Sequence, residues 1–430
     1  MKAAFYTLGC KVNSYETEVT INDFKKAMYD IVPFEEKADV YVINTCSVTN
    51  TSDQKSRKII REAIKKNKDA IIVVMGCYSQ IKHNTLKEID GVDIIIGTNY
   101  RTKILDFIEK YKKNKEKIIK IDDVNHLKFE NMKLDKFENH TRAFVKIQDG
   151  CNNFCSYCII PYTRGNIRSK NKNLVIEEVT NLVNNGYKEV VLTGIHTGHY
   201  GLDLENYDFS DLLNELEKIE GLERIRISSI EIKELNEKFI NTLKNSKKIV
   251  NHIHIPLQSG CDKILELMNR RYNMEFYFNK IEEIRKIRPD IAITTDVIVG
   301  FPDESEEDFN ITKENIKKLK FTELHVFPYS KRENTKAANM KNQIDGNIKK
   351  ERVRELINLS NDLKNEYYNK FNNKTDDLLV EKFNNGILIG HLSNYGKVKV
   401  EGKKEDVNKI IKVKLLDYKD DCYNAIKLEV

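Results

Sequence analysis

Three cysteines, Cys151, Cys155 and Cys158, stand within one stretch of eight residues, directly after an apolar segment at Ala143–Ile147. Thiolates are protein ligands of zinc and of iron–sulfur clusters, so this density of thiols indicates an inorganic partner. A structural zinc loop pairs its cysteines as Cys-x2-Cys, whereas the spacing here is Cys-x3-Cys-x2-Cys with no fourth ligand placed to complete the set. We therefore favour an iron–sulfur cluster over zinc, with one iron left open to chelate a small molecule.

Three more cysteines, Cys10, Cys46 and Cys77, each directly follow a short apolar run near the N-terminus. If these runs are parallel strands, their carboxyl ends share one edge of the sheet and the three thiols converge there. The alternative is three unrelated buried cysteines, which are common in cores. The repeated position favours a second cluster, whereas Cys261 and Cys422 have no partner at ligand spacing and are interpreted as structural.

The elements that would position these thiols are read from hydrophobic patterning. The first 110 residues alternate apolar runs with polar helical stretches, which predicts an open parallel α/β sheet. From Thr141 onward, six further strand–helix units predict a partial (β/α)6 barrel, whose chemistry lies on the loops after its strands. The expected strands are 3–8, 40–44, 71–75 and 93–96 in the first part, and 143–147, 189–192, 225–228, 253–257, 293–299 and 323–327 in the second.

The C-terminal part has a different pattern. A charged helix with an apolar stripe is expected at 346–368, followed by short β-like runs at 378–383, 386–392, 398–401, 410–416 and 425–430. These runs predict a small antiparallel β-barrel of the kind that binds oligonucleotides. Side chains that can stack on bases or meet phosphates are Phe383, Tyr395, Tyr418, Lys397 and Lys399. A barrel with a purely stabilising role is the alternative.

Polar residues and glycines follow the strands of the predicted barrel, on the same rim as the cysteine loop. They are candidate cofactor-binding residues, although turn residues at strand ends are the common alternative. The candidates are Thr193, Gly194, Ser228, Ser229, Glu231 and Gln258. The histidines at 196, 199, 252 and 254 are interpreted as packing residues rather than metal ligands. No catalytic residue is expected beyond the cluster ligands.

Composition sets the remaining limits. The 430 residues are 40% hydrophobic and 32% charged, and the length favours several domains. We expect domains at 1–115, 141–372 and 373–430, with a Lys-, Glu- and Asn-rich linker at 116–140 that contains at most one strand, at its apolar run 118–121. No run reaches the length of a membrane span, so a cytoplasmic protein is expected. A net charge of +6 permits a polyanionic partner without predicting one.

The cysteine loop, with Tyr157 before its third thiol, resembles the radical S-adenosylmethionine (SAM) superfamily. Together with the N-terminal cysteines and the terminal barrel, it resembles the methylthiotransferase family over essentially the whole chain. The stretches that carry this resemblance are 142–151, 161–165, 256–260 and 296–302. The terminal barrel resembles the TRAM domain, an RNA-binding module of tRNA-modifying enzymes.

The resemblance implies two 4Fe–4S clusters, one on Cys10, Cys46 and Cys77 and one on the Cys151–Cys158 loop. It implies two SAM molecules: one donates a methyl group to sulfur carried at the first of these clusters, and the other is cleaved to a 5′-deoxyadenosyl radical at the second. Tyr157 and the rim residues would bind SAM. The implied partners are the tRNA anticodon arm and a reductant such as flavodoxin or ferredoxin, and a monomer is expected.

Two stretches, 325–332 with its continuation to Met340 and 192–201, are similar to the branch that acts on threonylcarbamoyladenosine. This implies methylthiolation of carbon 2 of that nucleoside at position 37 of tRNAs reading ANN codons. Asn334 departs from the Gly that is frequent in this branch, although Asn tolerates a left-handed backbone. The alternative is a sister enzyme acting on isopentenyladenosine tRNA or on a ribosomal protein aspartate.

Overall fold

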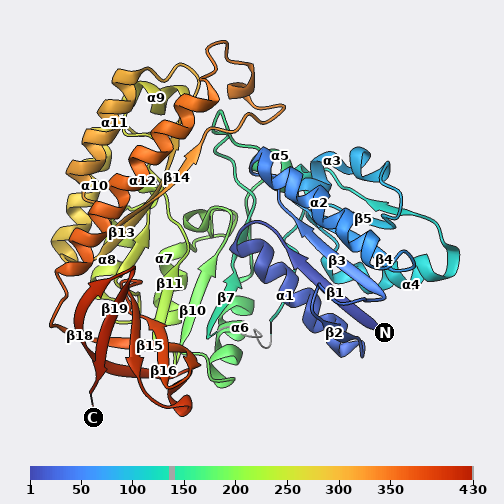
Figure 1. The fold of residues 1–430 in the computed structure, drawn as a ribbon, viewed down its shortest axis with the longest axis horizontal. Helices are drawn as coiled ribbons and strands as arrows, with labels where there is room; N and C mark the ends of the chain where they lie inside the picture. The colour runs from blue at the N-terminus through green and yellow to red at the C-terminus, as the bar shows by residue number, and fades with distance from the viewer. Residues whose placement is uncertain (135–140, 429–430) are drawn as a thin grey trace.

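The computed structural model describes residues 1–134 and 141–428 of the chain. It contains an N-terminal parallel sheet, a central part with two parallel sheets and a C-terminal closed barrel. The N-terminal sheet, blue in Figure 1, and the barrel, red, flank the central part. These features confirm the fold class expected from the sequence. No helix of the described residues is long and apolar enough to cross a bilayer.

The N-terminal sheet has six parallel strands in the order β2-β1-β3-β4-β5-β6. They are β1 (Lys2–Thr7), β2 (Asp30–Val32), β3 (Val40–Thr45), β4 (Ile71–Gly76), β5 (Ile94–Ile96) and β6 (Ile118–Lys120). Alternate residues of β3 and β4 enter two separate hydrophobic clusters, so both faces of the sheet are buried. The covering helices are α1 (Lys11–Lys26), α2 (Asn50–Lys66), α3 (Cys77–Lys87) and α4 (Ile104–Asn114).

One of the two short edge strands was not expected. No strand was expected at β2, whereas β6 is the single strand that the linker at 116–140 was expected to contain, at its apolar run 118–121. Because β6 pairs with β5, the sheet continues beyond residue 115. The last six residues of the expected linker, 135–140, lie outside the described residues.

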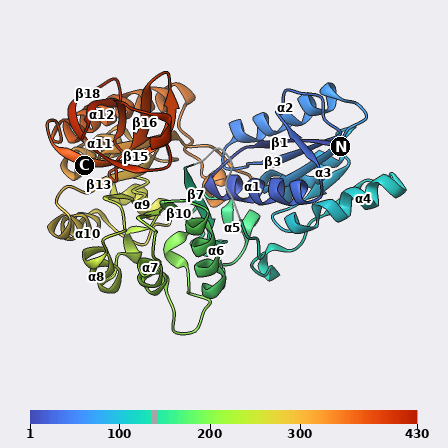
Figure 2. The ribbon, with the colours of Figure 1, turned by 90° about the horizontal axis from the view of Figure 1, so that it is seen from below.

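The central part contains two three-stranded parallel sheets, β11-β10-β7 and β12-β13-β14, linked by an isolated bridge between Ile225 and Ile249. The strands are β7 (Arg142–Lys146), β10 (Glu189–Thr193), β11 (Arg224–Ile227), β12 (His252–His254), β13 (Ala292–Val299) and β14 (Glu323–Pro328). All six strands were predicted. The helices are α5 (Ile160–Arg164), α6 (Lys172–Asn184), α7 (Phe209–Glu217), α8 (Glu237–Asn245), α9 (Asp262–Leu267), α10 (Met274–Ile287) and α11 (Glu306–Leu319), and Figure 2 shows α6, α7, α8 and α10 along the outside.

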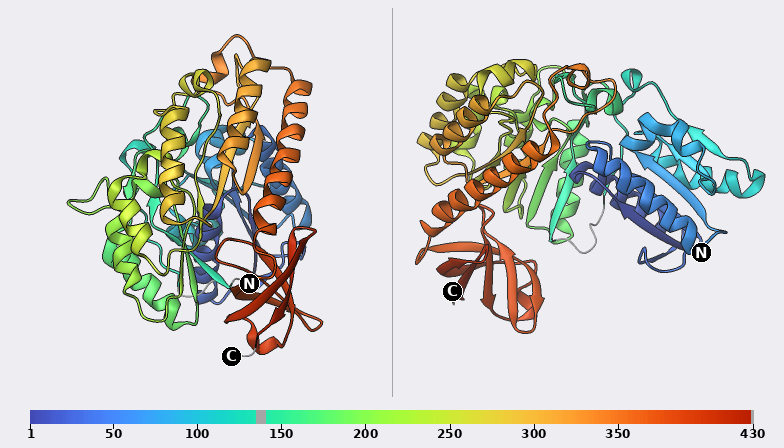
Figure 3. Two further views of the ribbon diagram at one scale, coloured as in Figure 1. Left: turned by 90° about the vertical axis from the view of Figure 1, so that its left-hand side faces the viewer. Right: turned by 45° about the horizontal axis from the view of Figure 1, so that its top comes forward.

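A long helix, α12 (Gly346–Asn369), joins the central part to the closed barrel, as the right panel of Figure 3 shows. The barrel order is β15-β16-β17-β19-β18. Its strands are β15 (Thr375–Asn384), β16 (Ile387–His391), β17 (Lys397–Glu401), β18 (Ile410–Lys419) and β19 (Cys422–Lys427). All pairs are antiparallel except β17 with β19, which is parallel. Residues 429 and 430, the end of the expected last strand, lie outside the described residues.

Candidate functional site

The loop that carries Cys151, Cys155 and Cys158 runs from β8 (Gln148–Asp149) to α5. The Cys151 amide donates to the Gly165 carbonyl at 2.9 Å, and the Cys158 amide donates to the Cys155 carbonyl at 3.0 Å. Gly150 is required at its start: its φ is +75°, and a Cβ there would stand 1.9 Å from the Asn166 carbonyl oxygen. The backbone therefore fixes the path of the loop.

The chemistry of these three thiols fits an iron–sulfur cluster. Burial, followed by the neighbouring thiols of Cys155 and Cys151, raises the pKa of Cys158. Burial also raises the pKa of Cys155. Thiols that ionise this reluctantly on their own become thiolates when a metal supplies compensating positive charge, because binding and deprotonation are coupled.

Two basic side chains from elsewhere in the chain contact these thiols. Arg270 donates from Nη1 to Cys155 Sγ at 3.2 Å, and its Nη2 donates to Glu231 Oε2 at 2.5 Å. His196 Nδ1 lies 3.7 Å from Cys151 Sγ. Neither residue was predicted to approach the loop, because Arg270 belongs to a distant segment after α9 and carries no spacing signal. His196 was assigned to packing.

His196 also belongs to a buried group with His199 and Glu234. The two imidazole rings stack with centroids 3.5 Å apart, and Glu234 carboxylate oxygens lie 3.2 Å and 3.1 Å from their Nε2 atoms. Burial alone would lower the pKa of His196, but contacts with Cys151 and Glu234 raise it to about 10. The same pairing lowers the pKa of Glu234 to about 2 against the opposing effect of burial. His196 and Glu234 therefore form an ion pair at neutral pH.

Two cavities adjoin the cysteine loop. The first has a volume of about 300 Å³ and is lined by both polar and apolar atoms. Its lining includes Asn153, Cys155, His199, Glu231, Glu234 and Arg270. The second, of about 250 Å³, is more apolar and includes Val48, Tyr157, Cys158, Gln258, Asp296, Ile298 and Phe327. Each is large enough for part of a nucleoside-sized ligand, and each is bounded by a cysteine of the loop.

The predicted rim residues are distributed around these cavities. Glu231 lines the first cavity, and Tyr157 and Gln258 line the second. Gln258 has φ +65°, a conformation that costs energy for a residue other than Gly, and hydrogen bonds to the Asp296 carbonyl and from the Ile298 amide hold it there. The other candidates line neither of these two cavities: Thr193, Gly194, Ser228 and Ser229. Their role in cofactor binding stays a prediction.

The N-terminal thiols occupy corresponding places in the first sheet. Cys10, Cys46 and Cys77 follow β1, β3 and β4, which are adjacent strands. Burial, then the nearby Cys77 and Cys10 thiols, raise the pKa of Cys46 to about 11. Asn13 lies among them, with Oδ1 accepting from Cys10 Sγ at 3.6 Å and Nδ2 donating to the Thr45 carbonyl at 3.1 Å. The sheet therefore gathers thiols that are distant in sequence into one electrostatically coupled group, which fits a second cluster.

The loop after β14 docks on the N-terminal part. Arg332, buried, donates to Asp53 Oδ2 at 2.8 Å, to Ser47 Oγ at 2.9 Å and to Asn50 Oδ1 at 2.7 Å. Ser47 directly follows Cys46. The contact therefore joins the N-terminal thiols to the loop after β14, which lies near the Cys151–Cys158 loop. These contacts engage both terminal nitrogens of Arg332 and fix the two parts together.

The terminal barrel corrects one sequence-based interpretation. Tyr418 was expected to stack on bases, but it is only 7% exposed and packs with Tyr368 and Tyr423 in the barrel core. Tyr395 lies under the Arg226 guanidinium, 4.4 Å from ring centroid to Cζ, at the junction with the central part. Phe383 and Lys399 remain exposed on the barrel surface.

Comparisons with family models match the N-terminal part and the central part of the chain separately. Residues 2–97 match a family model described as uncharacterized protein family UPF0004, and residues 145–316 match the radical SAM superfamily. The chain is 48% identical over 420 residues to threonylcarbamoyladenosine tRNA methylthiotransferase MtaB of Bacillus subtilis, covering 96% of this chain and 93% of that protein. It is 42% identical to MtaB of Aquifex aeolicus, covering 96% and 100%.

Two further comparisons show the breadth of the relationship. The tRNA-2-methylthio-N(6)-dimethylallyladenosine synthase of Clostridium tetani is 36% identical, covering 96% of this chain and 94% of that protein. The solved structure of the radical SAM methyltransferase TsrM from Kitasatospora setae aligns with a TM-score of 0.57 at 14% identity, over 78% of this chain and 77% of that chain. That second likeness concerns the fold alone.

Proposed function

The chain belongs to the methylthiotransferase family of radical SAM enzymes, and from this premise we propose that it methylthiolates carbon 2 of threonylcarbamoyladenosine at position 37 of tRNAs reading ANN codons. The observation that carries the choice of nucleoside is the gradation of identity. The chain is 48% identical to the threonylcarbamoyladenosine enzyme of Bacillus subtilis but 36% identical to the dimethylallyladenosine enzyme of Clostridium tetani.

The two thiol groups have separate places in this proposal. Cys151, Cys155 and Cys158 would hold a 4Fe–4S cluster with one open iron, and Cys10, Cys46 and Cys77 would hold a second. When bound, the first supplies the electron that cleaves SAM to a radical able to attack an unactivated C–H bond, which acid–base groups cannot do. The second would carry the sulfur that a different SAM molecule methylates.

The chain's own residues bind, orient and exclude water in this proposal. Glu231 and Arg270 line the polar cavity beside Cys155 and would hold the polar groups of SAM. Tyr157 and Gln258 face the apolar cavity beside Cys158, which also includes Val48 of the N-terminal part. That cavity is the place for the adenine, because it borders both parts of the molecule and its apolar wall suits an aromatic ring.

The remaining partners are proposed from the same reaction. The tRNA anticodon arm is the substrate, and the exposed Phe383 and Lys399 of the terminal barrel are placed to contact it. A flavodoxin or ferredoxin supplies electrons, and the enzyme acts in the cytoplasm as a monomer.

Complementation tests the choice of nucleoside. A Bacillus subtilis strain lacking its MtaB would express this chain or its Cys155→Ala variant, and tRNA nucleosides would be measured by mass spectrometry. We expect the chain, but not the variant, to restore 2-methylthio-threonylcarbamoyladenosine and to leave 2-methylthio-isopentenyladenosine unchanged. In a strain lacking the isopentenyladenosine enzyme, restoration of that product instead would favour the sister function.

A further inference from the structure

Arg164 connects the two thiol groups directly. It ends α5, six positions after Cys158, yet its guanidinium lies at the edge of the N-terminal sheet. Its Nε donates to Cys77 Sγ at 3.3 Å, and its Nη2 donates at 2.9 Å to Asn13 Oδ1, the same oxygen that accepts from Cys10. A side chain from the helix that follows the cysteine loop therefore contacts the thiol group of the N-terminal sheet.

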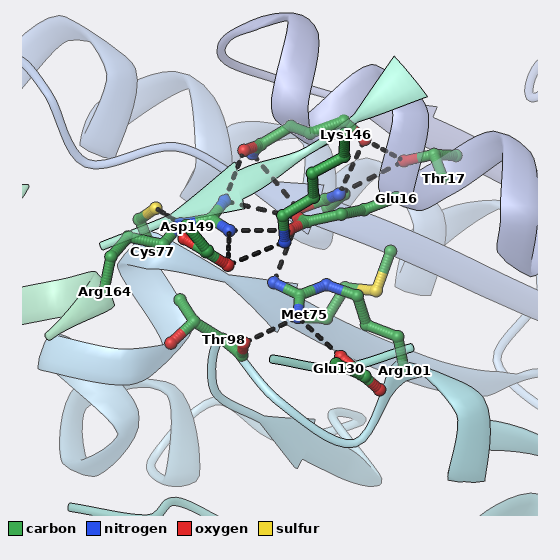
Figure 4. A network of polar contacts seen from close by, with 12 residues as sticks. Glu16, Thr17, Met75, Cys77, Thr98, Arg101, Glu130, Lys146, Asp149 and Arg164 are labelled. Atoms are coloured by element: carbon green, nitrogen blue, oxygen red, sulfur yellow. Dashed lines mark hydrogen bonds and ion pairs between the residues drawn. The ribbon is translucent and has the colours of Figure 1, made fainter. Parts of the chain in front are cut away.

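A buried ionic network holds this guanidinium in place (Figure 4). The Arg164 side chain is fully buried, and its Nη1 donates to Glu16 Oε1 at 2.5 Å and to Asp149 Oδ2 at 3.3 Å. Lys146 contacts the same two carboxylates at 2.7 Å and 2.6 Å. Arg101 contacts Glu16 at 3.0 Å. With this many contacts, the guanidinium has little freedom to move relative to Cys77.

The charges of this network do not balance without a thiolate. Ion pairs among the described residues join four cations to three carboxylates. The cations are Arg101, Lys146, Arg164 and Arg168, and the carboxylates are Glu16, Glu130 and Asp149. A buried charge without a partner is costly. A thiolate at Cys77, as a cluster requires, supplies the missing negative charge beside Arg164.

We propose that Arg164 is a positioning residue for the cluster held by Cys10, Cys46 and Cys77, orienting the Cys77 sulfur and stabilising its negative charge. This inference rests on the second cluster of the proposed function and deepens it. It also gives a physical role to the stretch 161–165, which resembled the family motif but was not assigned a task. The short link from Cys158 to Arg164 makes the position of one cluster depend on the loop of the other.

The sign of the electrostatic effect follows from the charge. A cluster becomes more negative when it is reduced, so a fixed positive charge and a hydrogen bond to a ligand sulfur favour the reduced form. Removal of the Arg164 charge should therefore shift the reduction potential of this cluster to more negative values. A purely structural residue would not change the potential of a cluster that is retained.

The test uses the full chain with Cys151, Cys155 and Cys158 replaced by Ala, so that only the second cluster is reconstituted. Its potential is measured by anaerobic redox titration followed by electron paramagnetic resonance, with iron and sulfide content. We expect Arg164→Gln to lower the potential by more than about 59 mV, which corresponds to a tenfold change in a one-electron equilibrium. Arg101→Lys, in the same network but without a thiol contact, is the matched control and should keep the parent potential.

Arg164→Lys keeps the charge but loses the Nε donor, so we expect a potential near that of the parent and altered g-values of the reduced cluster. If circular dichroism shows that Arg164→Gln does not fold, the g-values of Arg164→Lys still test the proposal. Parent g-values in Arg164→Lys, or equal shifts in Arg164→Gln and Arg101→Lys, would overturn the proposal. The titration contains no tRNA, so its failure is distinguishable from failure of the proposed nucleoside specificity.

Discussion

The two groups of thiols are built in different ways. Cys151, Cys155 and Cys158 lie on one loop of eight residues, whereas Cys10 and Cys77 are separated by 67 positions and meet only because β1, β3 and β4 are neighbours. The first group depends on local backbone and the second on the whole sheet. The first borders two cavities, and the second lies against a buried ionic network. Cavities therefore adjoin the first group and buried charges adjoin the second, in which Cys10 is exposed.

The largest effect is expected from a variant that disrupts the local group, Cys151, Cys155 and Cys158. Cys155→Ala removes one proposed ligand of the cluster with the open iron, so SAM cleavage should fall below detection while the second cluster is retained. Half of the reconstituted iron should remain, and 5′-deoxyadenosine should be absent by chromatography. Substantial 5′-deoxyadenosine from this variant would contradict the assignment of the loop.

The converse variant disrupts the dispersed group, Cys10, Cys46 and Cys77. Cys10→Ala should also lose half of the iron, but SAM cleavage should continue because the first loop is intact. Methylthiolated tRNA should not form, as measured by nucleoside mass spectrometry. If cleavage is lost while both clusters remain, the two groups do not divide the work in this way.

The next largest effect is expected at the contact between the loop after β14 and the N-terminal part. Arg332→Ala leaves Asp53 buried without its partner, and breaking a buried ion pair from one side costs about 3 kcal/mol. We expect a lower thermal midpoint, measured by circular dichroism. Arg332→Ala combined with Asp53→Asn should recover part of the loss, whereas equal midpoints for the single and double variants would exclude coupling between the two side chains.

A glycine near the dispersed group gives a smaller and more local effect. A Cβ at Gly76 would stand 2.5 Å from the Thr45 carbonyl oxygen, so Gly76→Ala must displace the ends of β3 and β4. We expect a loss of about 2 kcal/mol and a lower content of the second cluster. Gly186→Ala is the control, because Gly186 also has positive φ but no atom within 4 Å of a new Cβ. Equal cluster content in the two variants would contradict the steric argument.

The smallest expected effect comes from an exposed contact between the same two parts. Lys82 pairs with Glu333 at 2.5 Å, but the Glu333 side chain is 79% exposed and water screens the interaction. Glu333→Gln should leave the thermal midpoint unchanged within error. A fall as large as that of Arg332→Ala would show that the exposed pair, rather than the buried one, joins the parts.

The same contrast explains what the sequence could predict. The fold class followed from buried strands with regular patterning, and both groups of cysteines could be located because thiols at strand ends are conspicuous. The edge strand β2 was harder to recognise because it has three residues and pairs with a single neighbour. Arg270 and Arg164 could not be predicted to contact thiols, since their positions depend on packing between distant segments.

Tyr418 shows a different limit. Alternation along β18 is interrupted by a register shift between Leu415 and Tyr418, so both side chains enter the barrel core although they are an odd number of positions apart. A period of two assigns them to opposite faces. A bulge of this kind leaves no reliable trace in hydrophobic patterning. The expected strand ended at 416, and the prediction that Tyr418 stacks on bases was wrong because β18 continues to Lys419 and buries this ring.

The ionic network around Glu16 constrains how such chains can be recombined. Glu16 and Arg101 come from the N-terminal part, and Lys146, Asp149 and Arg164 come from the central part, so both parts contribute charges to one buried network. A chimera that exchanges one part with that of a relative would bury a mismatched charge unless both halves correspond. We expect these five positions to change together in evolution, and successful domain swaps to transfer them as a set.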